Sequence, residues 1–418
     1  MWKIYRRSRM LTSLKLVIRP KKLSDYYLST LCSLCLALNL NAAEINNEKL
    51  QVHGFVAQGV INADNSNYIN NDESLSLELT EVGLNASYQL NDDFRIAGQA
   101  VYLNGGNRYH AGFRLDYLLL EWNAFHNDVW QASFYLGRVK NNHWLYSSTR
   151  DVPFARPSII IPQVVYFDGF RDVAIGGDGA AVKLTYSDDV FGEIDFNFSK
   201  GKSAISDDQA DVVIGKFALG QIDHDLDTQA SVYWRPPFSP WRFGISALDS
   251  TFSYESSQVD NFFDSDFVFQ FYTVNAIYEG EFWQFSAEIF QEGFVTDGFY
   301  FPGFQRDDIG QGYYLQASYQ VTKAFTVLTR HEMFYANKDD KNGTKLAKST
   351  GGLVPSYFGF HNDNMLGLSY DFSSNFRINA EYHWMEGGAR LSPIVQPDPI
   401  ANDSKNWQVW AIQFMYWF

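Results

Sequence analysis

The stretch FRINAEYHWME, residues Phe376–Glu386, alternates strictly between apolar and polar side chains. Because successive side chains of a β-strand point to opposite faces, this stretch predicts a strand with one apolar and one polar face. Tyr313–Val321 shows the same alternation. The apolar face of the first stretch consists of Phe376, Ile378, Ala380, Tyr382 and Trp384.

Similar stretches follow one another along most of the chain, and we predict sixteen strands from them. An all-β chain with this many strands is typical of a sandwich or a barrel. The predicted strands are Leu50–Asn62, Leu75–Leu90, Asp93–Asn104, Gly112–Phe125, Val129–Val139, Val173–Tyr186, Val190–Lys200, Leu226–Arg235, Trp241–Ser253, Phe262–Tyr278, Phe282–Phe294, Gly312–Val321, Ala324–Tyr335, Asp363–Phe372, Phe376–Glu386 and Trp407–Phe418.

The connections between these strands alternate between short and long. The short ones are polar turns such as Asn91-Asp92 and Thr322-Lys323, which suit hairpins. The long ones run from about 7 to about 33 residues. Strict alternation places all short turns at one end of the sheet and all long loops at the other. This arrangement is typical of outer-membrane β-barrels, whereas a sandwich has no reason to keep it.

The N-terminus predicts export. Residues 1–22 carry eight Lys or Arg and no acid, and the apolar run Leu28–Leu40 precedes the small residues Ala42 and Ala43. This order is typical of a cleaved secretory signal peptide, and a run of 13 residues is too short to span about 30 Å of hydrocarbon. We therefore expect a signal peptide at residues 1–43 and one domain at residues 44–418. A short membrane anchor is the alternative.

Removal of residues 1–43 would leave 25 of the 33 basic and 47 of the 48 acidic residues, so the formal charge would fall from −15 to −22. Such a balance argues against nucleic acid as a partner, since phosphate binding needs clustered Lys and Arg. Both cysteines, Cys32 and Cys35, would also leave, which excludes a disulfide scaffold. We find no nucleophile, zinc or phosphate-loop motif, and therefore expect no enzymatic activity, no metal and no cofactor.

The mature chain has no run of 18 apolar residues, so a closed barrel is the membrane-spanning structure that it could form. Its last stretch, Trp407–Phe418, alternates and stops at an aromatic residue. This ending resembles that of Gram-negative outer-membrane porins of the 16-stranded trimeric type. The resemblance implies that Tyr416 and Phe418 act as an assembly signal, although Gln413 stands where many such signals have Gly.

The 33-residue connection after the fifth predicted strand contains Ile159-Ile160-Ile161 between prolines. A water-exposed loop should be polar, so this segment must pack on something. Porins of this family fold their third external loop into the lumen, and the resemblance implies the same here. Gly137-Arg138-Val139-Lys140 and Arg171 are also weakly similar to phosphate-selective porins.

We therefore expect a transmembrane antiparallel barrel of 16 strands with an inward-folded constriction loop. Arg150, Arg156 and Arg171, with Arg330 and Arg377, are expected to bias the constriction toward anionic or zwitterionic solutes. The alternative is that Arg150–Asp151 and Arg171–Asp172 are pairs that only hold the loop. The expected constriction and pore-lining residues are Lys140, Arg150, Asp151, Arg156, Tyr166, Asp168, Arg171, Asp172, Arg330, Arg377 and Glu381.

The function expected from these features is passive diffusion of small hydrophilic solutes through the outer membrane of a Gram-negative bacterium. A substrate-selective channel with a lumenal binding site is the alternative within this fold. An outer-membrane enzyme such as a lipase and a secreted soluble sandwich are alternatives of other classes. The family resemblance implies a homotrimer, Sec export, the barrel-assembly machinery, and contact with membrane lipid and lipopolysaccharide.

Overall fold

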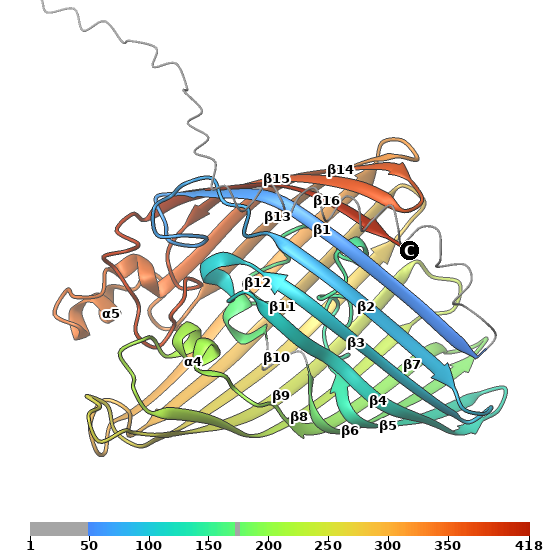
Figure 1. Ribbon diagram of the computed structural model, residues 1–418, viewed down its shortest axis with the longest axis horizontal. Coiled ribbons are helices and arrows are strands. Elements are labelled where there is room, and N and C mark those ends of the chain that lie inside the picture. Colours follow the sequence, from blue (N-terminus) through green and yellow to red (C-terminus); the bar gives the residue numbers. More distant parts are fainter. Residues whose placement is uncertain (1–48, 172–175) are drawn as a thin grey trace, which may run out of the picture. The chain divides into compact units, whose positions relative to one another are not determined.

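The computed structural model describes residues 49–171 and 176–418, so the expected signal peptide (1–43) and Asp172 lie outside the described residues. Sixteen strands form one closed antiparallel barrel, in which each strand pairs with the next along the chain and the last pairs with the first (Figure 1). The predicted architecture is confirmed.

The strands run 10 to 16 residues each. Their bounds are β1 (Leu50–Asp64), β2 (Thr80–Gln89), β3 (Phe94–Asn104), β4 (Gly112–His126), β5 (Trp130–Lys140), β6 (Gly176–Asp188), β7 (Gly192–Lys202), β8 (Gln221–Arg235), β9 (Trp241–Glu255), β10 (Ser265–Glu279), β11 (Trp283–Asp297), β12 (Gln305–Gln320), β13 (Phe325–Tyr335), β14 (Phe360–Ser373), β15 (Phe376–Glu386) and β16 (Asn406–Trp417).

Alternation along each strand separates an outer from an inner face. On the outer face, Ile245, Val274, Ile289 and Leu315 each expose more than half of their surface. Inner residues of the same strands are buried, because chain inside the barrel covers them. An apolar exterior on a closed cylinder is the arrangement that lipid requires, since every backbone group finds a partner within the sheet.

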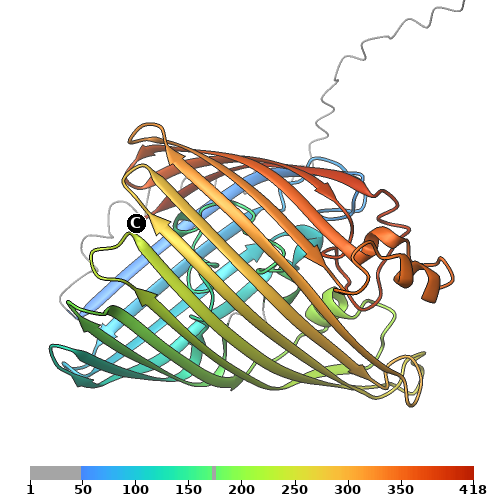
Figure 2. The same cartoon turned by 180° about the vertical axis from the view of Figure 1, so that it is seen from behind.

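The two ends of the barrel differ as the sequence predicts. The short helices α4 (Asp207–Val213) and α5 (Thr344–Ser349) belong to long loops, and both lie at the same end of the barrel (Figures 1 and 2). At the other end, short turns join the strands. Among residues 49–171 and 176–418, no helix has the length and apolar character needed to cross a membrane.

Three predicted strand bounds at the long-loop end are wrong by several residues. Strand β8 begins at Gln221 and β12 at Gln305, earlier than predicted, while β2 begins later, at Thr80. The extensions of β8 and β12 contain polar residues on both faces. Apolar and polar side chains must alternate only where one face of the strand meets an apolar environment. Strand ends that extend beyond this environment therefore need not alternate.

Glycines allow close approach of strands β4 to β7. Gly137 has φ +123°, and a Cβ there would lie 2.4 Å from the carbonyl oxygen of Leu118 on the neighbouring strand. A Cβ on Gly179 would lie 2.1 Å from the carbonyl oxygen of Lys200. Both glycines therefore lie where a neighbouring backbone approaches too closely for a Cβ.

Candidate functional site

The connection between β5 and β6 folds into the barrel, and its described part is residues 141–171. Side chains of the far wall hold its backbone. Glu381 of β15 accepts hydrogen bonds from the amides of Ile159 and Ile160, and Glu332 of β13 accepts one from Val164 at 3.1 Å. Since three consecutive isoleucines lie inside the barrel, the prediction that this segment packs on something is confirmed.

Arg330 and Tyr166 add two further anchors. Arg330 on β13 donates to Ile160 O at 2.8 Å and to Ser158 Oγ at 2.9 Å. The hydroxyl of Tyr166 donates to Glu288 Oε2 on β11 at 2.6 Å. Arg330 is 2% exposed, so it binds the loop and does not face water.

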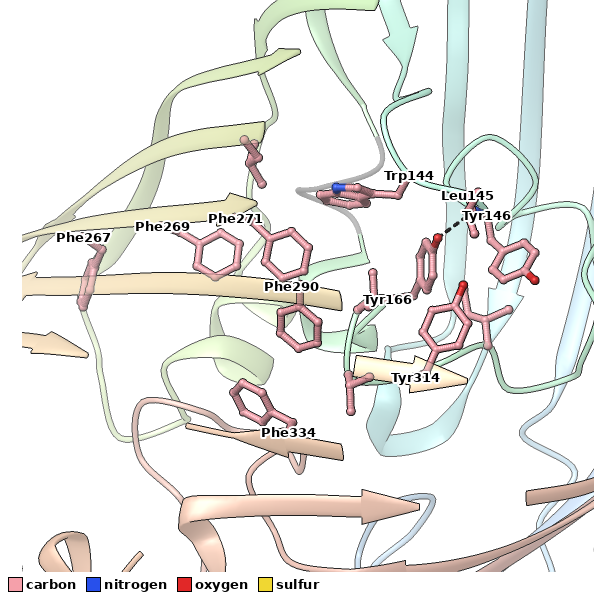
Figure 3. Close-up of a cluster of buried hydrophobic side chains, with 14 of the residues drawn as sticks. Trp144, Leu145, Tyr146, Tyr166, Phe267, Phe269, Phe271, Phe290, Tyr314 and Phe334 are labelled. Carbon is pink, nitrogen blue, oxygen red and sulfur yellow. Dashed lines mark hydrogen bonds between the residues drawn. The ribbon is translucent and has the colours of Figure 1, made fainter. Parts of the chain in front are cut away.

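Aromatic side chains fill the space between the loop and strands β9 to β13 (Figure 3). The Trp144 ring lies 5.4 Å from that of Phe271, whose ring lies 5.0 Å from that of Phe290. Phe290 in turn contacts Phe334, with ring centroids 5.9 Å apart. These inward-facing rings are buried, so this side of the lumen is packed with side chains. We call this group the aromatic cluster: Trp144, Tyr146, Tyr166, Phe267, Phe269, Phe271, Phe290, Tyr314 and Phe334.

The three arginines expected to face solute are buried in ion pairs. Arg150 Nη2 lies 3.1 Å from Asp168 Oδ1, and Arg171 pairs with Asp151. Arg156 Nη2 lies 2.6 Å from Glu81 Oε1. Their side chains are 2–3% exposed. The expected pairing of Arg150 with Asp151 is wrong, because the turn between them points their side chains to different partners. Pairing of Arg171 with Asp172 concerns a residue outside the described ones.

The loop carboxylates remain ionised inside this packing. Burial alone would raise the pKa of Asp168, but Arg108, Arg150 and Arg171 outweigh it and lower that pKa below its ordinary value. The pKa of Asp151 is lowered in the same way by Arg171, Lys140 and Arg150. Four arginines and three carboxylates thus form one charge network that fixes the loop. Its members are Arg108, Arg150, Arg156, Arg171, Glu81, Asp151 and Asp168.

A β-bulge places Asp116 beside the loop. Gln99 of β3 pairs with Tyr117 and Ala100 pairs with Leu115, which leaves Asp116 without a residue opposite. Bulges of this kind redirect a side chain. Asp116 Oδ2 accepts from Lys140 Nζ at 2.7 Å and from Gln99 Nε2 at 2.7 Å. We call these three residues the Lys140–Asp116 bridge.

Two pockets lie on either side of this bridge, along strands β1 to β7. The loop-end pocket, of about 440 Å³, includes Asp116 and Asp151 in its lining. The turn-end pocket, of about 460 Å³, includes Gln99 and Lys140. The bridge therefore marks the boundary between two polar spaces inside the barrel, on the side that the aromatic cluster leaves open.

The charges that face these pockets are basic. The loop-end pocket is lined by the partly exposed bases His110, Arg114 and Arg138. Its other charged lining residues, Arg108, Asp116, Asp151 and Asp168, are each less than 9% exposed. The lining of the turn-end pocket includes five basic residues and, among the described residues, no Asp or Glu. Three of them are the cations Arg95, Lys140 and Lys183, and the other two are His53 and His143. Burial lowers the pKa of His143 to about 4, so its ring adds no positive charge at pH 7.

The remaining expected residues lie elsewhere. Arg377 pairs with Asp371 and donates a hydrogen bond to Phe154 O at 3.3 Å. It also lines a third pocket, of about 270 Å³, together with Arg156 and Glu381. Phe418 lies where β16 closes on β1, with backbone hydrogen bonds of 3.0 and 3.1 Å to Gly54. Tyr416 pairs with Val56 across the same seam.

Sequence reasoning missed the partners that β2, β4 and β11 supply. Glu81, Asp116 and Glu288 face inward from these strands and are less than 9% exposed. Their positions on alternating strands indicate an inward direction. Nothing in the sequence, however, separates a wall carboxylate that faces water from one that binds the loop.

Known proteins resemble this chain in structure only. No protein-family profile and no curated protein sequence matches it. OmpT of Vibrio cholerae, an outer-membrane protein, superposes with a TM-score of 0.54 at 12% identity, over 88% of this chain and 97% of that one. An anion-selective porin from Comamonas acidovorans gives 0.55 at 13% identity, over 88% and 99%.

OprB of Pseudomonas putida is also similar, with a TM-score of 0.56 at 10% identity over 90% of this chain and 96% of that one. At such identities the likeness concerns the fold. The barrel described above is thus the 16-stranded barrel of Gram-negative outer-membrane porins, over nearly the full length of the solved chains.

Proposed function

We propose that this chain, which has the fold of the outer-membrane porins, resides in the outer membrane and conducts small hydrophilic solutes by passive diffusion. The apolar exterior suits lipid, and a barrel of sixteen strands is wide enough for an aqueous path. A channel rather than an enzyme is the function that this architecture supports.

The observation that carries the proposal is the pair of pockets that meet at the Lys140–Asp116 bridge. Packed aromatic rings occupy the opposite side of the lumen, so the path proposed for solutes is eccentric and follows β1 to β7. Its narrowest point is the bridge, together with Asp151. Selectivity in such channels depends on the charges at the narrowest ring.

We further propose a preference for anionic or zwitterionic solutes, which we assign to the bases lining the two pockets. The carboxylates that line the pockets are buried, and Glu121 and Asp195 are less exposed than Arg95 and Lys183, with which they pair, so water in the turn-end pocket meets mainly the cations. At the loop-end pocket, Asp178 is 58% exposed and balances its partner Arg138. The anion-selective porin from Comamonas acidovorans shows that this fold is compatible with such a preference. In this proposal, the buried arginines shape the loop and act on solute only through it.

The structural neighbours also support proposals on assembly. OmpT of Vibrio cholerae has been solved in a trimer form, at 13% identity and a TM-score of 0.54, over 88% of this chain and 99% of that one. We propose a homotrimer here as well, together with Sec export by residues 1–43 and recognition of Tyr416 and Phe418 by the barrel-assembly machinery. Lipopolysaccharide would then surround the long-loop end.

Reconstitution into a planar bilayer tests the channel. Purified barrel, checked for folding by its heat-modifiable gel mobility, should produce discrete conductance steps in KCl. Under a KCl gradient, the reversal potential should have the sign of anion preference. Folded protein that inserts without conducting would reject the channel function, and a cation-selective reversal potential would reject the preference.

A further inference from the structure

The turn-end pocket differs from an ordinary section of water-filled lumen in the chemistry of its wall. Arg95 and Lys183 reach into it with side chains that are 43% and 39% exposed. No carboxylate among the described residues lines it, whereas the chain overall has more acids than bases. The wall therefore presents hydrogen-bond donors and positive charge to whatever occupies the pocket.

Carboxylates adjacent to these cations fix them without using all of their donors. Arg95 Nε and Nη2 both contact the same oxygen, Glu121 Oε2, at 2.6 and 2.5 Å. Lys183 Nζ contacts Asp195 Oδ1 at 3.1 Å, which accounts for one of its three donors. Glu121 is 9% exposed, so the arginine is the more accessible member of its pair. Each pair positions a cation whose remaining N–H groups are available to a ligand.

Neutral groups complete the wall. Amides of Gln51, Asn85 and Asn142 offer both donors and acceptors, and the rings of Tyr117 and Tyr135 add flat apolar surface. A volume of about 460 Å³ falls within the range of small-molecule sites. Because each cation of the wall already pairs with one carboxylate, the wall offers a ligand charged N–H donors and little net charge, which suits small organic anions better than highly charged ones.

We propose that the turn-end pocket is a binding site for small organic carboxylates, with Arg95 and Lys183 as the residues that contact the carboxylate. The inference rests on the proposed channel function, and it makes the channel selective by binding as well as by size. A solute that enters would be held there before it leaves, so its flux would saturate.

Succinate tests this inference, and succinamide, which has the same shape without charge, is the control ligand. Succinate added on the short-turn side should reduce single-channel KCl conductance along a saturating curve, and succinamide should not. The double variant Arg95→Gln/Lys183→Gln should weaken this block about tenfold or more, since charge-assisted hydrogen bonds are lost.

Arg235→Gln/Lys323→Gln is the matched control variant. Arg235 is 45% exposed, pairs with Glu279 at 3.7 Å and, like Lys323, lies near a short turn outside the turn-end pocket. Block by succinate should be unchanged in this variant. Equal weakening in both variants would overturn the inference, because it would show a general effect of charge at the mouth.

The outcomes separate the binding site from the channel. Conductance without saturable block by succinate would overturn the site and leave the channel function standing. If no conductance is seen, titration calorimetry of succinate on the folded barrel in detergent tests the site by itself. Binding that requires Arg95 and Lys183 would support the site, and absence of binding would overturn it.

Discussion

Lys140 Nζ lies 2.7 Å from Asp116 Oδ2, and these two residues line different pockets. Their contact therefore lies between the two pockets. Lys140 is 11% exposed and Asp116 is 1% exposed at the side chain, so water reaches the pair mainly from the lysine side.

Removal of both charged groups should widen the passage. We expect Lys140→Ala/Asp116→Ala to raise single-channel conductance, because the contact that separates the pockets is gone and no buried charge is left unpaired. Lys140→Ala alone leaves Asp116 buried without its cation and should destabilise the barrel by about 3–5 kcal/mol. Conductance and urea unfolding measure the two effects. Lys405→Gln, which removes an exposed partner of Glu386, is the control and should change neither.

Two loop arginines should differ in their effect on stability. Glu81 has a side chain that is 1% exposed, and Arg156→Met removes its close cation. Among the described residues, Gln413 Nε2 at 3.3 Å and Arg171 Nη2 at 4.0 Å remain near it. We therefore expect the free energy of unfolding to fall by about 3–5 kcal/mol. Arg150→Met leaves Asp168 still paired with Arg108 at 2.7 Å and should cost clearly less. Urea unfolding of the folded barrel gives both values. Equal losses would contradict the pairing described here.

Docking of the loop should weaken in mild acid through His143. Burial between Ser199 and Ser231 lowers the pKa of His143 from 6.5 to about 4. An undocked His143 binds a proton as the pH falls below 6.5, whereas the docked one does not until about pH 4. The docked state is thus favoured fully above pH 6.5 and loses stability toward pH 4, by roughly 3 kcal/mol over the window.

Hydrogen-exchange protection of residues 142–147, corrected for the intrinsic pH effect, measures this change. His143→Gln should remove the contribution of this residue and so reduce the dependence between pH 6.5 and 4. The lowered pKa values of Asp151 and Asp168 keep these carboxylates charged through the same window, so they should contribute only at lower pH. Protection that is constant across the window in the native chain would refute the assignment to His143.

Gly137 should tolerate no side chain. Gly137→Ala would place a Cβ 2.4 Å from Leu118 O, at a residue whose backbone φ is +123°. Backbone strain alone should lower the free energy of unfolding by about 1–3 kcal/mol. Gly293→Ala is the control, since the nearest atoms to its Cβ lie 3.8 Å away. The temperature at which gel mobility changes should fall for Gly137→Ala and stay near the native value for Gly293→Ala.

The barrel could be predicted from the sequence because its two signals are local. Alternation within Phe376–Glu386 and the short turn Thr322-Lys323 each concern neighbouring residues. Similar alternation recurs in the other strands, and similar turns recur at every second connection. The composition of Ile159–Ile161 also indicated a packed loop. The partners of these residues could not be predicted, because Arg330 and Glu381 lie more than 160 residues further along the chain.

The expected pair of Arg150 with Asp151 is wrong for a related reason. Adjacency in sequence suggested Arg150 with Asp151, but in irregular backbone two neighbours can point in opposite directions. The path of the loop brings Asp168 to Arg150 and Arg171 to Asp151. The inward turn of Asp116 depends on a shift of register at Gln99, which no single strand encodes by itself.

The aromatic cluster has a consequence for how such a molecule can change. Both pockets beside the Lys140–Asp116 bridge are lined by β1 to β7, the β5–β6 loop and residues near α4, all within residues 51–212. The rings that support the loop belong mainly to β9 to β13. The wall of the proposed solute path and the aromatic support of the loop thus lie in different halves of the polypeptide, while the charge network that also fixes the loop lies in the first half. Substitutions at exposed pocket residues outside that network could therefore change the solute while the aromatic cluster stays as it is.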